Sequence, residues 1–175
     1  LLSCTGQEDE KIEKELKKCV NEEINKNLQL ADDLKSINFY DLMLEIERVL
    51  LKEEVLINSS KTEYYNLFDN IKESKGERLK ITYNKIFALC KDIGFDFELF
   101  IIIDTIFTKC PYETSIDYKD TQGKLMYTQA ILLNQLISEG YENHIIIKDL
   151  IDIIEEEKFN KIIYRATIIF LTLIN

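Results

Sequence analysis

The chain has few of the residues that interrupt regular secondary structure. Its 175 residues include one proline, five glycines and no tryptophan. Because proline and glycine are the strongest breakers of helices and strands, their scarcity favours long regular elements. Hydrophobic residues make up 46% of the chain and charged residues 31%, the ordinary balance of a globular domain. A chain of this length buries roughly two thirds of its unfolded surface, so a core is available without disulfides or metals.

Histidine is almost missing as well, which limits the chemistry of the chain. His144 is the only histidine, and we interpret it as a solvated residue near a helix start. Residues 117–123 superficially resemble a calcium loop, but Lys119 stands at a ligand position and Gly123 is misplaced. Neither a glycine-rich phosphate loop nor a zinc-spaced cysteine pair is present. We therefore predict no metal, no cofactor and a function that is not enzymatic.

Acidic residues outnumber basic residues. The chain has 32 Asp and Glu against 22 Lys and Arg, for a formal net charge of −10. Nucleic acid would be repelled rather than attracted, so we predict no nucleic-acid partner. A basic protein is the complementary partner. On composition alone we favour the simpler explanation that the acidity keeps the protein soluble.

The N-terminal residues are Leu1-Leu2-Ser3-Cys4, followed by polar residues. An apolar residue three places before a cysteine, with a small residue directly before it, resembles the lipobox of bacterial lipoproteins. The resemblance implies that Cys4 is acylated, which would anchor the protein to the lipid bilayer of the bacterial cell envelope. The protein would face the periplasm. Residues 1–7 would be a lipobox remnant and polar tether, and residues 8–175 a single all-helical domain.

Two alternatives to this interpretation stay open. The tetrapeptide can be a chance match, with Cys4 an ordinary thiol. The acidic cluster at residues 7–10 also resembles the tag that sends some lipoproteins to the cell surface. We prefer to interpret its acids as the first turn of a helix, where they meet the positive end of the helix dipole.

The C-terminal stretch, residues 159–174, carries one charge after Lys161, at Arg165. A helix that is apolar on nearly every side is normally buried on nearly every side. The stretch is shorter than the ~20 apolar residues of a membrane span. We therefore predict that it forms the buried central helix of an all-α fold.

The rest of the chain predicts about seven or eight helices in antiparallel hairpins. Apolar residues recur mostly every fourth position from Ile12 to Leu28. We expect a cap at Asn38, a capping box opening at Ser60, and a helix ending by Pro111. The Ile-rich runs at 99–103 and 145–147 are interpreted as helical. Glycines at 94 and 140 end similar patterns 46 residues apart, which is similar to HEAT and armadillo repeats and leaves a bundle or a short α-solenoid open.

Cysteine and tyrosine supply the remaining candidates. In an oxidising compartment one disulfide among Cys19, Cys90 and Cys110 is expected, with Cys90–Cys110 our first choice because these residues flank one hairpin. Buried free thiols are the alternative. Candidate partner-binding residues are aromatic or acidic and are predicted to lie at the surface: Tyr64, Tyr65, Tyr112, Tyr118, Glu155, Glu156 and Glu157.

These observations favour an acidic envelope lipoprotein that binds another protein. One version is an inhibitor or immunity protein that neutralises a secreted antibacterial toxin by covering a basic cleft. A second is a structural or assembly lipoprotein of an envelope complex. An alternative from another class is a hydrolytic enzyme that uses carboxylates in a helical cleft.

Overall fold

The computed structural model describes residues 4–28, 36–70, 76–95, 103–115 and 124–174, and these ranges contain helices and no strand. The predicted all-α class is therefore confirmed. The elements, in chain order, are α1 (Cys4–Leu28), α2 (Phe39–Lys52), α3 (Lys61–Asn70), α4 (Gly76–Asp92), the π-helix η1 (Thr105–Lys109), α6 (Cys110–Ser115), α7 (Lys124–Glu139), α8 (His144–Asp152), α9 (Glu156–Phe159) and α10 (Ile162–Ile174).

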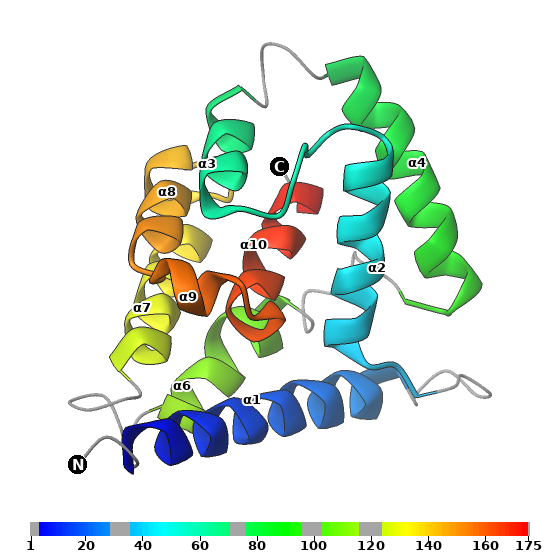
Figure 1. The fold of residues 1–175 in the computed structure, drawn as a ribbon. Helices are drawn as coiled ribbons and strands as arrows, with labels where there is room; N and C mark the ends of the chain where they lie inside the picture. Colours follow the sequence, from blue (N-terminus) through cyan, green and yellow to red (C-terminus); the bar gives the residue numbers. More distant parts are fainter. Residues whose placement is uncertain (1–3, 29–35, 71–75, 96–102, 116–123, 175) are drawn as a thin grey trace.

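Helix α10 lies at the centre of the bundle, as its apolar composition predicts (Figure 1). It packs mainly against α2, with Phe170 of α10 and Phe39 of α2 at a ring-centroid distance of 6.4 Å. Helices α3, α7, α8 and α9 lie on one side of α10, and α2 and α4 lie on the other (Figure 1). The buried C-terminal helix thus joins the two halves of the molecule.

Helix α1 runs along the base of the bundle beneath α6 and α2 (Figure 1). Its buried residues include Ile12, Leu16, Val20 and Ile24, which confirms the predicted stripe as far as Ile24, while the side chain of Leu28 lies outside the described part. The helix begins at Cys4, earlier than the first turn at Glu8 that we expected. No proline precedes Glu8 to stop the helix there, so the acidic residues follow in its second turn.

Several predicted helix ends are confirmed. The Asn38 side chain accepts the backbone amides of Tyr40 at 3.2 Å and Asp41 at 3.5 Å, as an N-cap does. Ser60 accepts the amide of Glu63 at 3.2 Å, which is half of the predicted capping box. The Glu63 carboxylate accepts from the Ile57 amide instead of reaching back to Ser60.

Glycine ends two helices at the predicted positions. Gly94 has φ 72° and Gly140 has φ 105°, in the left-handed region that favours glycine. Gly140 leads into α8, whose cap is Asn143, and α7 and α8 pack together as the predicted hairpin. The run 145–147 is helical, as expected, whereas residues 99–102 of the other run lie outside the described ranges.

Pro111 does not end a helix, and this prediction is wrong. It is the second residue of α6, directly after the π-helix η1. The amide of Cys110 reaches back to the Thr105 carbonyl, five residues earlier, so the hydrogen-bond ladder is shifted at this point. Residues 103–115 are helical without a break, so Pro111 lies inside a helix, directly after a π-helical turn whose shifted hydrogen bonds accommodate the missing amide hydrogen.

Candidate functional site

The most strongly buried ion pair among the described residues joins α2 and α10. Arg165 donates from Nε to Glu47 Oε1 at 2.8 Å and from Nη2 to Oε2 at 3.0 Å. Its Nη1 donates to the Phe159 carbonyl at 2.6 Å. The Tyr64 hydroxyl donates to Glu47 Oε1 at 2.7 Å. All three guanidinium nitrogens and both carboxylate oxygens therefore make hydrogen bonds, as burial of a charge pair requires.

This cluster holds the fold together and is not a substrate site. Tyr64, Glu47 and Arg165 are only 0%, 4% and 6% exposed, so no substrate reaches them. Burial raises the pKa of Tyr64 well above its ordinary value, and the adjacent Glu47 carboxylate raises it further. A neutral tyrosine that donates to a paired carboxylate is the stable form of this arrangement.

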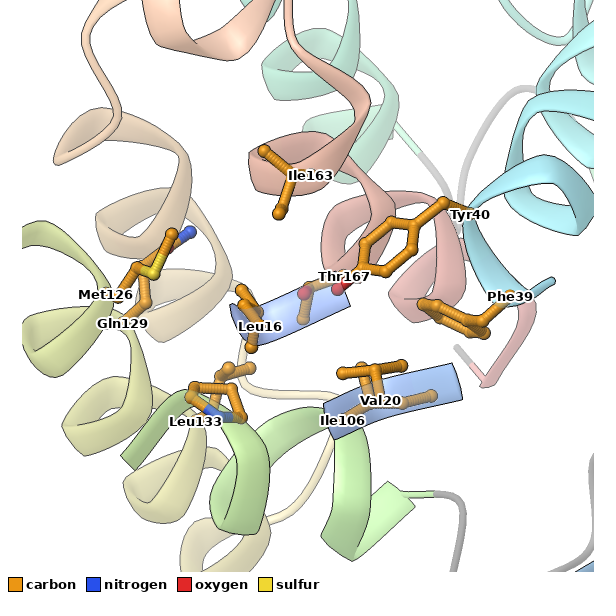
Figure 2. A pocket seen from close by; sticks show the side chains of 11 residues that line it. Leu16, Val20, Phe39, Tyr40, Ile106, Met126, Gln129, Leu133, Ile163 and Thr167 are labelled. Atoms are coloured by element: carbon orange, nitrogen blue, oxygen red, sulfur yellow. The ribbon is translucent and has the colours of Figure 1, made fainter. Parts of the chain in front are cut away.

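A second polar group lies around a small cavity between α1, α2, α7 and α10 (Figure 2). The cavity volume is about 20 Å³, enough for one water molecule. Tyr40 and Thr167 line one side and Gln129 lines the opposite side, among apolar residues such as Leu16 and Leu133. The space is too small for a metabolite, so we do not assign an active site here.

A wider hollow lies at the surface between the end of α2 and α4. Its volume is about 450 Å³, and Lys52, Glu53, Glu54, Arg78 and Ile81 line it. Lys85 pairs with Glu53 at 2.6 Å, and Arg78 pairs with Glu54 at 3.4 Å. Because these ion pairs join opposite charges across its edge, the hollow presents no uniform charge to a small ligand.

The predicted tyrosine surface does not form as expected. Tyr64 is fully buried, because its position on α3 faces α10 and Glu47, so its assignment to a binding surface is wrong. Tyr65 is half-buried beneath the Lys148 ammonium, 5.0 Å from the ring centroid. Tyr112 is 41% exposed and its ring lies 5.8 Å from that of Tyr127. Tyr118 lies outside the described residues.

The predicted acidic residues, in contrast, are all at the surface. Glu155, Glu156 and Glu157 are exposed where α8 ends and α9 begins, and Asp149 and Asp152 are exposed on α8 beside them. We call these five residues the acidic corner. Lys61 fixes the end of α8 by donating to the carbonyls of Asp152 at 2.8 Å and Ile154 at 2.9 Å.

The backbone at the acidic corner differs from our expectation. We expected these glutamates at a helix C-terminus, where the dipole disfavours them. Instead Glu155 is the N-cap residue of α9, and Glu156 and Glu157 occupy its first turn. The expected conflict with the helix dipole is therefore absent, because α8 ends at Asp152 and the glutamates begin a separate helix of four residues.

One disulfide is present, but its partners are not those we favoured. Cys19 of α1 is bonded to Cys110 of α6, with their Cα atoms 5.7 Å apart, while Cys90 is a buried free thiol. The Cys90–Cys110 prediction is therefore wrong. Cys90 belongs to α4, which packs on α2, whereas Cys110 begins α6, which packs on α1. One turn along α1, Glu23 pairs with Lys109 at 2.7 Å and strengthens the same junction.

Comparison with known proteins places the chain in no family: no family model, curated protein or solved structure matches it. Among the described residues, no group of three or more His, Cys, Asp or Glu side chains is arranged to hold a metal ion. None of the helices in the described ranges has the length and apolarity to cross a membrane. The acidic corner is the candidate functional site.

Proposed function

We propose that this protein is tethered to the bacterial envelope and works by binding a basic protein through the acidic corner. An inhibitor or immunity protein that covers the basic cleft of a secreted toxin is the version that the charge and size of the chain favour. An assembly lipoprotein of an envelope complex is the second version. The two differ in the number of partners.

The acidic corner is the observation that carries this proposal. Five exposed carboxylates lie within nine residues, and two of them continue the exposed side of α8. Four of them lie in α8 or in the one-turn α9, and Glu155 lies in the short connection between these helices, so the fold sets their spacing. Such a surface attracts a basic partner at long range and speeds association.

The interior supports a role at the surface. The buried ion pair is closed to substrates, and the cavity beneath Tyr40 holds only about 20 Å³. Neither offers the enclosed, ligand-sized pocket that is typical of small-molecule enzymes.

The disulfide supports a location in an oxidising compartment. Cysteine pairs such as Cys19–Cys110 persist in the periplasm and are rare in the cytosol. Helix α1 begins at Cys4, so an acyl group on this residue would sit directly at the end of a 25-residue helix. We expect the anchor to hold the bundle close to the bilayer, with little freedom between lipid and domain.

Affinity capture from native cells tests the proposal. The tagged full-length protein is compared with a corner variant, Glu155→Lys/Glu156→Lys/Glu157→Lys. A control variant, Glu10→Lys/Glu15→Lys/Glu22→Lys, makes the same change of net charge on exposed positions of α1. We expect one stoichiometric basic protein with the wild type and the control, and its loss from the corner variant.

The identity of the captured protein separates the two versions. For an inhibitor, the purified partner should be toxic alone and harmless when this protein is present. Several envelope proteins would favour the assembly version. A partner that the corner variant retains equally well would contradict the role of the acidic corner. Membrane fractionation of a Cys4→Ser variant tests the anchor, which predicts its release into the soluble fraction.

A further inference from the structure

Helix α4 forms one edge of the molecule (Figure 1), and the side chains described on its outer side are exposed. Its inner side buries Thr82, Ile86 and Cys90, and the Tyr83 hydroxyl donates to the Thr172 carbonyl of α10. We define the basic face as the exposed side chains that project from the opposite side of α4: Lys80, Ile81, Asn84, Phe87, Ala88 and Lys91.

The basic face has the opposite charge to the molecule as a whole. In a chain of net charge −10, the sequence of α4 contains four cations and two acids, Glu77 and Asp92, and two of the cations, Lys80 and Lys91, belong to the basic face. Arg78 and Lys85 pair with Glu54 and Glu53 of the α2 end. Lys80 and Lys91 belong to the outer side. Lys80, Asn84, Phe87 and Lys91 follow one another at spacings of four, three and four residues, so they lie in one line along the helix.

Apolar side chains lie between these charges. Ile81 is 51% exposed and Phe87 is 47% exposed, which is high for large apolar side chains. Ile81 also lines the hollow of about 450 Å³ beside α2. An exposed aromatic residue between two lysines, next to a hollow, is a typical composition for a protein interface.

The chain itself carries a surface that complements this face. Ile145 is 73% exposed on α8, and Asp149 and Asp152 follow it at spacings of four and three residues, leading into the glutamates of α9. One surface therefore combines apolar residues with cations, and the other combines an apolar residue with anions. Helices α4 and α8 lie at opposite edges of the bundle, so the two surfaces cannot meet within one molecule (Figure 1).

We propose that the basic face of one molecule binds the acidic corner of a second copy of this chain. The contact joins two different surfaces, so each copy keeps one of each surface free and further copies can add. Two charged helical faces of this kind give a weak association that salt weakens further. The inference uses the acidic corner of the proposed function, and self-association would compete there with a basic partner.

Sedimentation velocity on the purified chain, with its disulfide intact and Cys4→Ser to prevent acylation, tests this proposal. At low ionic strength we expect the average mass to rise above the 20.6 kDa monomer as concentration increases. At an ionic strength of about 1 M, where the Debye length is about 3 Å, the monomer should predominate. A monomer at every concentration and at low salt would overturn the proposal.

Charge-reversal variants locate the contact. Lys80→Glu/Lys91→Glu and Glu156→Lys/Glu157→Lys should each weaken self-association about tenfold or more, since like charges then face each other. Mixing the two variants should restore association, because each altered surface then meets an opposite charge. The control Glu15→Lys/Glu22→Lys changes the net charge by the same amount as Glu156→Lys/Glu157→Lys and should still associate.

The variant Glu156→Lys/Glu157→Lys is the most informative, because it reduces the net negative charge of the protein and so reduces general repulsion between molecules. Nonspecific association would increase in this variant, whereas the proposed contact is lost. Association that persists in both variants, or that mixing does not restore, would overturn the proposal. Capture of a different acidic protein by the basic face of a strictly monomeric chain would overturn it too. The capture experiment detects a different, basic protein, so failure of self-association and failure of the proposed function give distinguishable results.

Discussion

Arg165 is the only charged residue in the sequence of α10, and Glu47 is what makes its burial tolerable. An unpaired guanidinium in this core would lose its hydration without compensation, a penalty of several kcal/mol. The bidentate geometry and the Phe159 carbonyl supply the missing partners. The ion pair therefore also specifies how α10 is oriented against α2, since only one rotation of α10 brings Arg165 to Glu47.

Removing one partner of this pair should be far worse than removing both. We expect Arg165→Met or Glu47→Leu to reduce the free energy of unfolding by about 3 to 5 kcal/mol, because each leaves a buried charge unpaired. The double variant should lose much less than the sum of the two. Tyr64→Phe, which removes one hydrogen bond and no charge, should lose about 1 to 2 kcal/mol. Urea unfolding measures all four proteins, and additive losses would contradict this account of the pair.

Asn38 gives a second test at a single residue. Its side chain accepts two backbone amides at the start of α2. Asn38→Ala should lower the free energy of unfolding by about 1 kcal/mol, whereas Asn38→Asp should retain most of the stability. Ser36→Ala, at an exposed position just before the cap, is the matched control and should have little effect. Equal losses at both positions in thermal unfolding would show that the cap is not formed.

At the scale of the elements, a disulfide links α1 to α6, a helix distant from it in the sequence. The Cys19–Cys110 bond joins residues 91 positions apart. Cys90 remains a free thiol, buried on the side of α4 that packs against α2. Burial raises the pKa of the Cys90 thiol to about 12, so very little reactive thiolate is present at neutral pH.

Alkylation followed by peptide mass mapping checks this arrangement. In the native protein at pH 8 we expect Cys90 to resist an alkylating reagent. It should become labelled on unfolding without reductant, whereas Cys19 and Cys110 should be labelled only after reduction. A Cys90→Ala variant controls for the other thiols. Labelling of Cys19 in the unfolded, unreduced protein would instead indicate the Cys90–Cys110 pair.

Elements whose position depends on local sequence were predictable. The apolar composition of residues 159–174 predicts a buried helix, and Asn38 and Gly94 mark helix ends through their own backbone preferences. The prediction for Pro111 was wrong because the π-helix η1 directly before it is not signalled by the local sequence. The spacing of Cys90 and Cys110 suggested a hairpin, but it contained no information about α1.

Some features of the candidate site were likewise predictable from the local sequence, and others were not. The exposure of Glu155, Glu156 and Glu157 was predictable from their charge. The burial of Tyr64 was also predictable, because Tyr64, Leu67 and Phe68 share one apolar face of a helix, and assigning Tyr64 to a binding surface overlooked this spacing. Its hydrogen bond to Glu47 was not predictable. A pair such as Glu47 and Arg165, 118 residues apart, leaves no periodic signal in one sequence.

At the scale of the whole molecule, buried tyrosines should set the alkaline limit of stability. Burial raises the pKa of Tyr83 to about 12, and it raises the pKa values of Tyr40 and Tyr64 above their ordinary value of 10.0 as well. Above pH 10 the unfolded chain therefore releases protons that the folded chain retains. The unfolded state then binds fewer protons, so the free energy of unfolding falls as the pH rises.

The expected loss begins near pH 9, where the unfolded Cys90 thiol ionises. It becomes steeper above pH 10 as the unfolded tyrosines ionise, and it continues through pH 12, the folded pKa of Tyr83. Each tyrosine that stays protonated in the fold contributes a slope of about 1.4 kcal/mol per pH unit. Cys90, with its pKa also raised, acts in the same direction. Urea unfolding midpoints measured between pH 8 and pH 11 (about three units) test how steeply the free energy of unfolding falls with pH. Tyrosinate absorbance should show that some of the nine tyrosines titrate only on unfolding. Tyr40→Phe should make the decline shallower above pH 10 without altering it below. A decline of unchanged steepness in this variant would assign the alkaline limit to other groups.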